Sequence, residues 1–223
     1  MLIGWISSRS SITLSMRRYW QFLILMMWPL VGWTHPHSWI EQQTTVLGDS
    51  HHITGLKMVW SFDVVTTAYT LDGEDMSKAH RHETLQKVGA SIIAHMLPDH
   101  FFTYFYRDGK PIRYQMVHDY HVRMPHKKFI LYFTIPLDKP LPLDGHKLSL
   151  MIFDRSYYVD MYWDNAKSIK FSPALKGHCK MKLLKPHPTP AEVSYAMSLP
   201  PNADPDYKLG QLFTQKLELW CRP

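Results

Sequence analysis

Short stretches of alternating apolar and polar residues, separated by proline and glycine turns, constrain the fold of this chain more than any other feature. Residues 128–135 alternate most strictly, and an alternation of period two places the apolar side chains on one face of a strand. Further strands are predicted at 37–47, 51–62, 101–106, 111–124, 147–153, 157–163, 179–184 and 213–220. Turn residues at 48–50 and 108–109 predict two hairpins. The pattern therefore indicates a mainly antiparallel β protein.

One segment repeats with helical spacing instead. Apolar side chains in residues 75–96 recur every three or four positions, Asp75 or Ser77 can cap the start, and Pro98 follows the end. Residues 66–72 fit neither pattern clearly. We expect an α+β fold of two packed, sandwich-like sheets with one inserted helix. The proline-rich segment 186–205 is expected to cross the surface near the C-terminus.

The first 34 residues have the parts of a signal peptide. Basic residues precede an apolar run over 19–31 that is too short to span a bilayer comfortably, and the small residues Gly32 and Thr34 precede His35. We predict export, cleavage after Thr34, and a single exported domain over residues 35–223. The alternative is an uncleaved anchor or an apolar N-terminal helix.

Composition suits a globular exported protein. Removing 34 of 223 residues leaves about 189, enough for one domain, and 45% of the residues are hydrophobic while 20% are charged. The formal charge of +6 falls to about +3 without the three leader arginines, which is too low to indicate a nucleic-acid partner. Cys179 and Cys221 are the two cysteines, and in an oxidising compartment we expect them to form a disulfide. Two free, buried thiols are the alternative.

The residues after the predicted cleavage site, His35-Pro36-His37, have the pattern of a metal-binding pair. In an extended chain residues i and i+2 share a face, so His35 and His37 can bind one divalent ion, and Pro36 stiffens the link. Cleavage after Thr34 also gives His35 a free α-amine close to its own ring. The alternative is two exposed histidines at a frayed end.

A metal ion needs further ligands, and two aspartates are candidates. Asp63 ends the strand predicted to pair with the first one, and Asp154 follows another strand at a tight turn. Either could instead be an ordinary turn or cap residue. Other histidines are spaced so that their side chains diverge, and we expect most of them to be solvated: His51-His52, His80-x-His82 and His118-x-x-His121.

These ligand types predict binding rather than catalysis. Zinc accepts mixed histidine and aspartate ligands, so Zn²⁺ is the expected metal, with Ni²⁺ or Cu²⁺ as alternatives. An N-terminal histidine that uses both its amine and its ring would suit Cu²⁺, so a copper carrier or copper oxidase is the alternative function. A structural or assembly factor whose histidines bind nothing is a third. Outside the copper alternative we expect no enzyme, because no catalytic serine, cysteine or carboxylate motif is recognisable.

Five groups of residues are characteristic in combination. They are His35-Pro36-His37-Ser38-Trp39-Ile40; Trp60-Ser61-Phe62-Asp63; Phe102-Thr103-Tyr104 with Asp108-Gly109-Lys110-Pro111; Phe133-Thr134-Ile135-Pro136-Leu137 with Pro140-Leu141; and Phe153-Asp154-Arg155-Ser156-Tyr157-Tyr158-Val159. With the cysteine pair, they resemble a bacterial family of exported proteins classed as a domain of unknown function. That family is often labelled the periplasmic component of an uncharacterised transport system. The resemblance covers most of the chain after the leader.

This resemblance implies a role in zinc transport. Members look like partners of inner-membrane metal permeases of the nickel/cobalt type, and one such pair, the Zev system, is associated with zinc binding and acquisition. The chain is therefore expected to be a periplasmic zinc-binding accessory protein. Relatives often have proline where this chain has Arg155, which changes the turn but not the proposed ligand Asp154.

Overall fold

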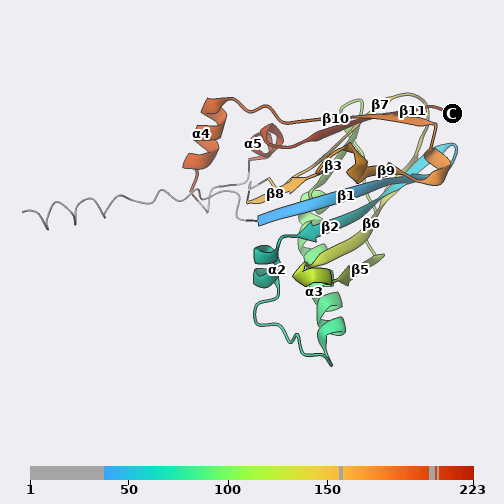
Figure 1. Cartoon of the computed structure of the whole chain (residues 1–223). Coiled ribbons are helices and arrows are strands. Elements are labelled where there is room, and N and C mark those ends of the chain that lie inside the picture. Colours follow the sequence, from blue (N-terminus) through green and yellow to red (C-terminus); the bar gives the residue numbers. More distant parts are fainter. Residues whose placement is uncertain (1–37, 156–157, 201–203, 205) are drawn as a thin grey trace, which may run out of the picture. The chain divides into compact units, whose positions relative to one another are not determined.

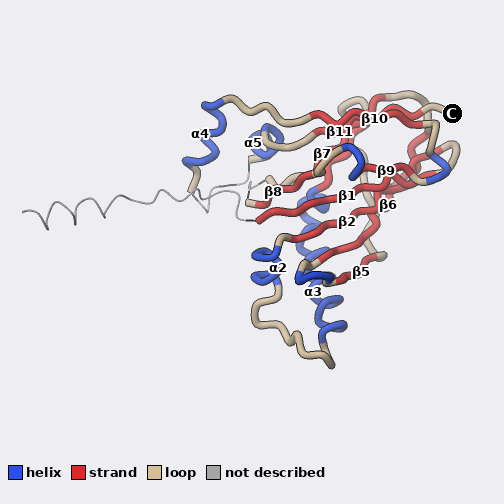
Figure 2. Tube along the Cα trace, viewed as in Figure 1, coloured by secondary structure: helices blue, strands red, loops and turns tan. Residues whose placement is uncertain are grey.

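The computed structural model describes residues 38–155, 158–200, 204 and 206–223 (Figure 1). The predicted signal peptide, His35 and His37 lie outside these ranges. Within them the chain forms two β-sheets and four α-helices, so the predicted α+β class is confirmed (Figure 2). No helix of the described ranges combines the length and the apolar character needed to cross a membrane.

Sheet A is built around the predicted first hairpin. Its strands in spatial order are β5 (Tyr120–Arg123), β6 (Ile130–Pro142), β2 (His52–Phe62), β1 (Ser38–Gly48) and β8 (Val159–Tyr162), with β9 (Ile169–Phe171) also beside β1. Four of these strands pair antiparallel, from β5 through β6 and β2 to β1. In contrast, β8 and β9 run parallel to β1, so two segments from late in the sequence complete one edge of the earliest strand.

Sheet B is antiparallel throughout. Its strands in spatial order are β10 (Cys179–Leu184), β11 (Lys216–Cys221), β7 (Lys147–Ile152), β3 (Thr103–Arg107) and β4 (Lys110–Pro111). Every pairing along this order is antiparallel. Sheet B therefore combines the middle of the chain with its C-terminal end, and β11 joins the two parts.

The inner faces of both sheets contribute to one hydrophobic core. Trp60 and Phe133 of sheet A are buried, with ring centroids 4.9 Å apart and perpendicular planes, and Phe105 and Leu150 of sheet B belong to the same cluster. Burying a side chain of this size stabilises a fold by roughly 1.5–3 kcal/mol. Gln42 also lies in this interior with no exposed surface, and neither of its amide atoms has a hydrogen-bond partner in the described part of the chain.

Two helices, not one, lie between β2 and β3. The ambiguous segment after β2 forms α2 (Val64–Thr70), and α3 (Arg81–Met96) follows. The prediction that the long helix begins at Asp75 is wrong, because the Asp75 carboxylate accepts from the Ser77 amide at 2.9 Å and closes a local turn instead. The end of α3 at Met96 is as predicted.

Helix α3 packs beside β5 at one edge of sheet A. The Gln86 side chain donates to the Val122 carbonyl and accepts from the Val122 amide, both at 3.0 Å, so it supplies the bonds that a neighbouring strand would make. Gly89 permits this close approach, because a Cβ at that position would lie 2.5 Å from a Val122 methyl group.

The second predicted hairpin is only partly correct. Strands β3 and β4 pair across the Asp108-Gly109 turn, but β4 ends at Pro111, and β5 joins sheet A instead. The proline-rich C-terminal segment contains α4 (Pro190–Ser198), which begins with a capping box at Thr189 and Glu192. The remaining helical elements are α5 (Tyr207–Leu212) and the 3₁₀ segments η1 (Leu97–Phe102), η2 (Pro125–Lys127), η3 (Ala166–Ser168) and η4 (Pro173–Leu175).

Candidate functional site

Asp63 connects the end of β2 to the start of β1. One carboxylate oxygen caps α2 by accepting from the Val65 and Thr66 amides at 2.8 and 3.0 Å. The other accepts from the Trp39 amide at 3.1 Å and from the Thr66 hydroxyl. A carboxylate has about four lone-pair positions, so protein donors occupy the full acceptor capacity of Asp63. Metal coordination by Asp63 would therefore have to replace one of these bonds.

The same bonds keep Asp63 ionised. Partial burial raises the pKa of this carboxyl, but the hydrogen bonds from Thr66, Trp39 and Val65 outweigh it and hold the pKa below its usual value. A fixed negative charge therefore lies beside the second described residue of β1 at neutral pH.

Asp154 holds the strand on the other side of β1. Its side chain is buried, and one oxygen accepts from the amides of Tyr158 and Val159 at 3.2 and 3.3 Å. Val159 is aligned with Ser38 in the parallel pairing of β8 with β1. The structure thus brings the two predicted aspartates to opposite sides of the same short stretch, the beginning of β1.

Further carboxylates gather at this end of sheet A. Asp160 is aligned with Trp39, and Glu41 is aligned with Tyr162. Burial raises the pKa of Asp160. Burial also raises the pKa of the Tyr162 hydroxyl, and the charges of Glu41, Asp160, Asp164 and Asp63 add to that shift. We call Glu41, Asp63 and Asp160 the acidic cluster. Sequence patterns alone do not indicate Glu41 and Asp160, because their proximity depends on the parallel pairing of β1 with β8.

The described histidines form no metal site. His80 pairs with Asp75 at 2.8 Å, and His121 stacks on Tyr132 with ring centroids 4.5 Å apart. Across the ranges that the structure describes, no three histidine, cysteine, aspartate or glutamate side chains are grouped so that they could hold a metal ion. A site at the start of β1 would therefore need ligands from the preceding residues, which include His35 and His37.

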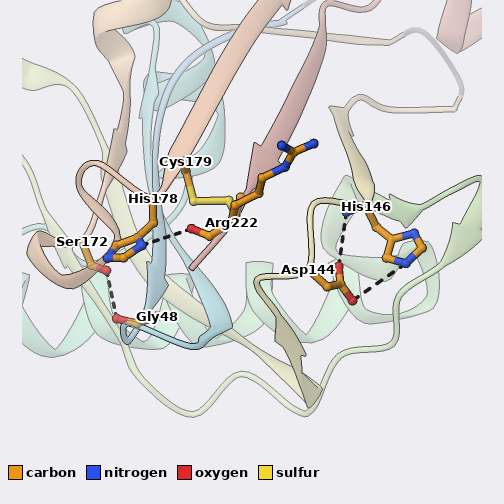
Figure 3. The surroundings of a disulfide bond; sticks show 8 residues. Gly48, Asp144, His146, Ser172, His178, Cys179 and Arg222 are labelled. Atoms are coloured by element: carbon orange, nitrogen blue, oxygen red, sulfur yellow. Dashed lines mark hydrogen bonds and ion pairs between the residues drawn. A yellow bond between two sulfur atoms is a disulfide. The ribbon is translucent and has the colours of Figure 1, made fainter.

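The predicted disulfide joins Cys179 to Cys221. These residues are directly opposite each other in β10 and β11, with their Cα atoms 4.1 Å apart, so the alternative of two free thiols is wrong. Figure 3 shows the adjacent His178 ring directed at the Arg222 carbonyl, with 3.1 Å between the ring nitrogen and the oxygen. The bond ties together both ends of the segment that carries α4 and α5.

Comparison with known proteins identifies the family. A family model described as "Protein of unknown function (DUF1007)" matches residues 20–221. The chain belongs to the DUF1007 family. An uncharacterized protein of Haemophilus influenzae is 30% identical to this DUF1007 member over 190 residues, which cover 84% of this chain and 91% of the relative. The predicted family resemblance is thereby confirmed, while these names state no metal, compartment or transport partner.

Proposed function

We propose that this protein is an exported, periplasmic accessory protein that binds a divalent metal ion, foremost Zn²⁺, at the beginning of β1. It works with an inner-membrane metal permease of the nickel/cobalt type. The observation that carries the proposal is that Asp63 bonds to Trp39, while Asp154 bonds to Val159, which is aligned with Ser38. Ser38 and Trp39 directly follow His37 in the sequence.

Chain connectivity ties the predicted histidines to this place. Ser38 and Trp39 are aligned with β8 on one side, and Trp39 exchanges hydrogen bonds with Asp63 on the other. Consecutive Cα atoms are about 3.8 Å apart. In the sequence, His37 directly precedes the stretch of β1 that lies between Asp63 and the strand bonded by Asp154. Imidazole and carboxylate together form a common ligand set for zinc.

Charge at this end favours a cation. The acidic cluster places three carboxyl groups around the first strand, and Asp63 is held ionised. The protein as a whole stays basic after removal of the leader, with a formal charge of about +3. A local negative field on a basic protein attracts metal ions to this end rather than to the rest of the surface.

Two further features support the compartment and the partner. The Cys179–Cys221 disulfide is typical of an oxidising environment such as the periplasm. Large apolar side chains are exposed near the same end of sheet A, with Trp39 at 45%, Val65 at 75% and Tyr69 at 83% of their full accessibility. Exposed apolar groups of this kind are a feature of protein interaction surfaces.

The proposal is tested by metal competition on the exported, purified protein, after its N-terminus has been sequenced. We expect 1:1 Zn²⁺ binding that a His35→Ala/His37→Ala double variant loses. The matched control is His80→Ala/His82→Ala, which removes a second His-x-His pair from the described surface. Asp63→Asn and Asp154→Asn should each weaken binding. Affinity should fall below about pH 6, where imidazole is protonated.

Two outcomes would end the proposal. One is an N-terminus that begins after residue 37. The other is equal metal affinity in the His35→Ala/His37→Ala variant and its control. Cu²⁺ rather than Zn²⁺ bound to the protein as purified, with an EPR signal that the same double variant loses, would favour the copper alternative instead.

A further inference from the structure

A cavity of about 730 Å³ lies beside β3, at the edge of sheet B. Its lining comes from η1, β3, the segment after β4 and α5, with Arg155 from the loop after β7. This volume is within the range of small-molecule sites. Neither Asp63 nor any other member of the acidic cluster lines it.

Aromatic rings form much of the wall. Tyr104 packs against Phe153 and Tyr207, with ring centroids 4.5 and 5.2 Å away, and His100 lies edge-on to it at 6.3 Å. The Tyr106 and Tyr207 hydroxyls bond to each other, which fixes α5 against β3. The wall is therefore suited to a flat, apolar molecular body.

Two hydrogen-bond donors in this lining have no partner among the residues that the structure describes. Tyr104 is 7% exposed, and its hydroxyl is buried without a hydrogen bond, as is Nε of Arg155. A terminal nitrogen of Arg155 bonds to Asp99, so the guanidinium is held in place while Nε stays unpaired. Buried donors without acceptors are costly, and a bound acceptor would remove that cost for both.

The charges of the lining favour an anion. Arg113 and Arg155 line the cavity, and among the described residues that line it there is no aspartate or glutamate. The Asp99 carboxylate pairs with Arg155 from outside the lining, which leaves Arg113 as the lining cation that no described carboxylate pairs with. Burial raises the pKa of Tyr104, so its hydroxyl stays protonated and can donate. Both unpaired groups therefore offer protons to the same kind of ligand atom.

The backbone at the rim adopts a costly conformation. His100, Phe101 and Phe102 all have positive φ, of 53°, 56° and 51°, in the left-handed region that non-glycine residues rarely enter. This run buries Phe101 at 2% exposure and places His100 in the lining. Strained backbone of this kind is concentrated at binding sites.

We propose that this cavity binds a small aromatic monocarboxylate. The aromatic body lies against Tyr104 and Tyr207, and the carboxylate accepts from the Tyr104 hydroxyl and Nε of Arg155. This function is independent of the metal site proposed above, so its test uses metal-free protein in the presence of a chelator.

The test compares 2-naphthoate with its uncharged counterpart 2-naphthamide by fluorescence titration of the exported protein. We expect naphthoate to bind about tenfold more tightly than naphthamide. Tyr104→Phe should weaken naphthoate binding about tenfold while the melting temperature stays the same or rises, because the lost oxygen has no partner. Tyr69→Phe, at an 83% exposed tyrosine, is the matched control and should change neither the naphthoate affinity nor the melting temperature. Arg155→Gln should also lose the preference for the anion.

Three results would each overturn the proposal. They are the absence of saturable naphthoate binding, equal affinities for the acid and the amide, and unchanged naphthoate affinity in Tyr104→Phe. A Tyr104→Phe variant that melts well below the wild type would likewise contradict it, since the hydroxyl would then serve the fold rather than a ligand.

Discussion

Asp63 offers a direct test of how the start of β1 is held. Two substitutions separate its two roles. Asparagine keeps an oxygen that can cap α2, but it loses the charge and presents an NH₂ group where the second oxygen accepts from Trp39 and Thr66. Alanine removes both the cap and the bond to β1.

The structure sets the expected magnitudes. An N-cap contributes about 0.5–2 kcal/mol, and asparagine is as good a cap as aspartate. The bond to the Trp39 amide involves a charged acceptor but lies at a partly exposed site, so we assign it about 1 kcal/mol. Asp63→Asn should therefore lower the free energy of unfolding by about 1 kcal/mol, and Asp63→Ala by about 2–3 kcal/mol.

At acidic pH the wild type and Asp63→Asn should have the same free energy of unfolding. The folded-state pKa of Asp63 lies below its unfolded value, which is near 4. The stabilisation is thus fully present above about pH 4 and is lost as the pH falls through the folded pKa. Asparagine does not titrate, so the gap should close over that same acidic interval.

Urea unfolding at pH 7 and at a series of acidic pH values provides the measurement. The control is Asp206, which caps α5 through the Lys208 and Leu209 amides at 2.8 and 3.1 Å. Asp206→Asn should leave the free energy of unfolding almost unchanged, because asparagine is as good a cap as aspartate. Two results would refute the conclusion that the Asp63 charge holds β1. One is an equal loss of unfolding free energy in Asp63→Asn and Asp63→Ala. The other is a difference between the wild type and Asp63→Asn that persists in acid.

Three further predictions concern the core and the cross-link. Gln42→Leu should raise the free energy of unfolding by about 1–3 kcal/mol in urea titration, since it removes a buried amide without partners, and a loss of stability would show that the amide is satisfied. Gly89→Ala should lower the melting temperature, because the clash of the new Cβ with Val122 destabilises the fold by about 1–3 kcal/mol, while the higher helix propensity of alanine offsets about 1 kcal/mol of this. A higher melting temperature would mean that α3 can shift away from β5 without cost. Cys179→Ser/Cys221→Ser should lower the free energy of unfolding by about 4 kcal/mol, because the disulfide closes a loop with a sequence separation of 42 and so restricts the unfolded chain. An unchanged urea midpoint would contradict this entropic account.

Local sequence patterns determined most of the individual elements. The alternation in residues 128–135 and 179–184 predicted strands that the structure contains, and the turn after residue 47 predicted the β1–β2 hairpin. The redox environment expected of an exported chain predicted the disulfide. Each of these features depends on neighbours along the chain or on a single pair of residue types.

These local patterns do not predict which strands from distant parts of the chain pair with each other. Alternation tells which side chains share a face, but it does not name the neighbouring strand, so β5 was assigned to the wrong hairpin. The same limit hid the parallel contact of β8 with β1, which brings Asp154 and Asp160 to the first strand. The sequence left Asp63 open as a metal ligand or as a turn or cap residue, and the structure shows that it caps α2.

The sequence by itself therefore determined the α+β class, most strands, the long helix and the cysteine pair, because local periodicity and turn chemistry control these. Only the tertiary structure decided which carboxylates meet at the beginning of β1 and which side chains line the cavity beside β3. Tyr104 and Tyr207 stand about a hundred positions apart and touch because α5 packs against β3 in a second, smaller hydrophobic cluster. Such contacts arise from the packing of whole faces, which no short stretch of residues encodes.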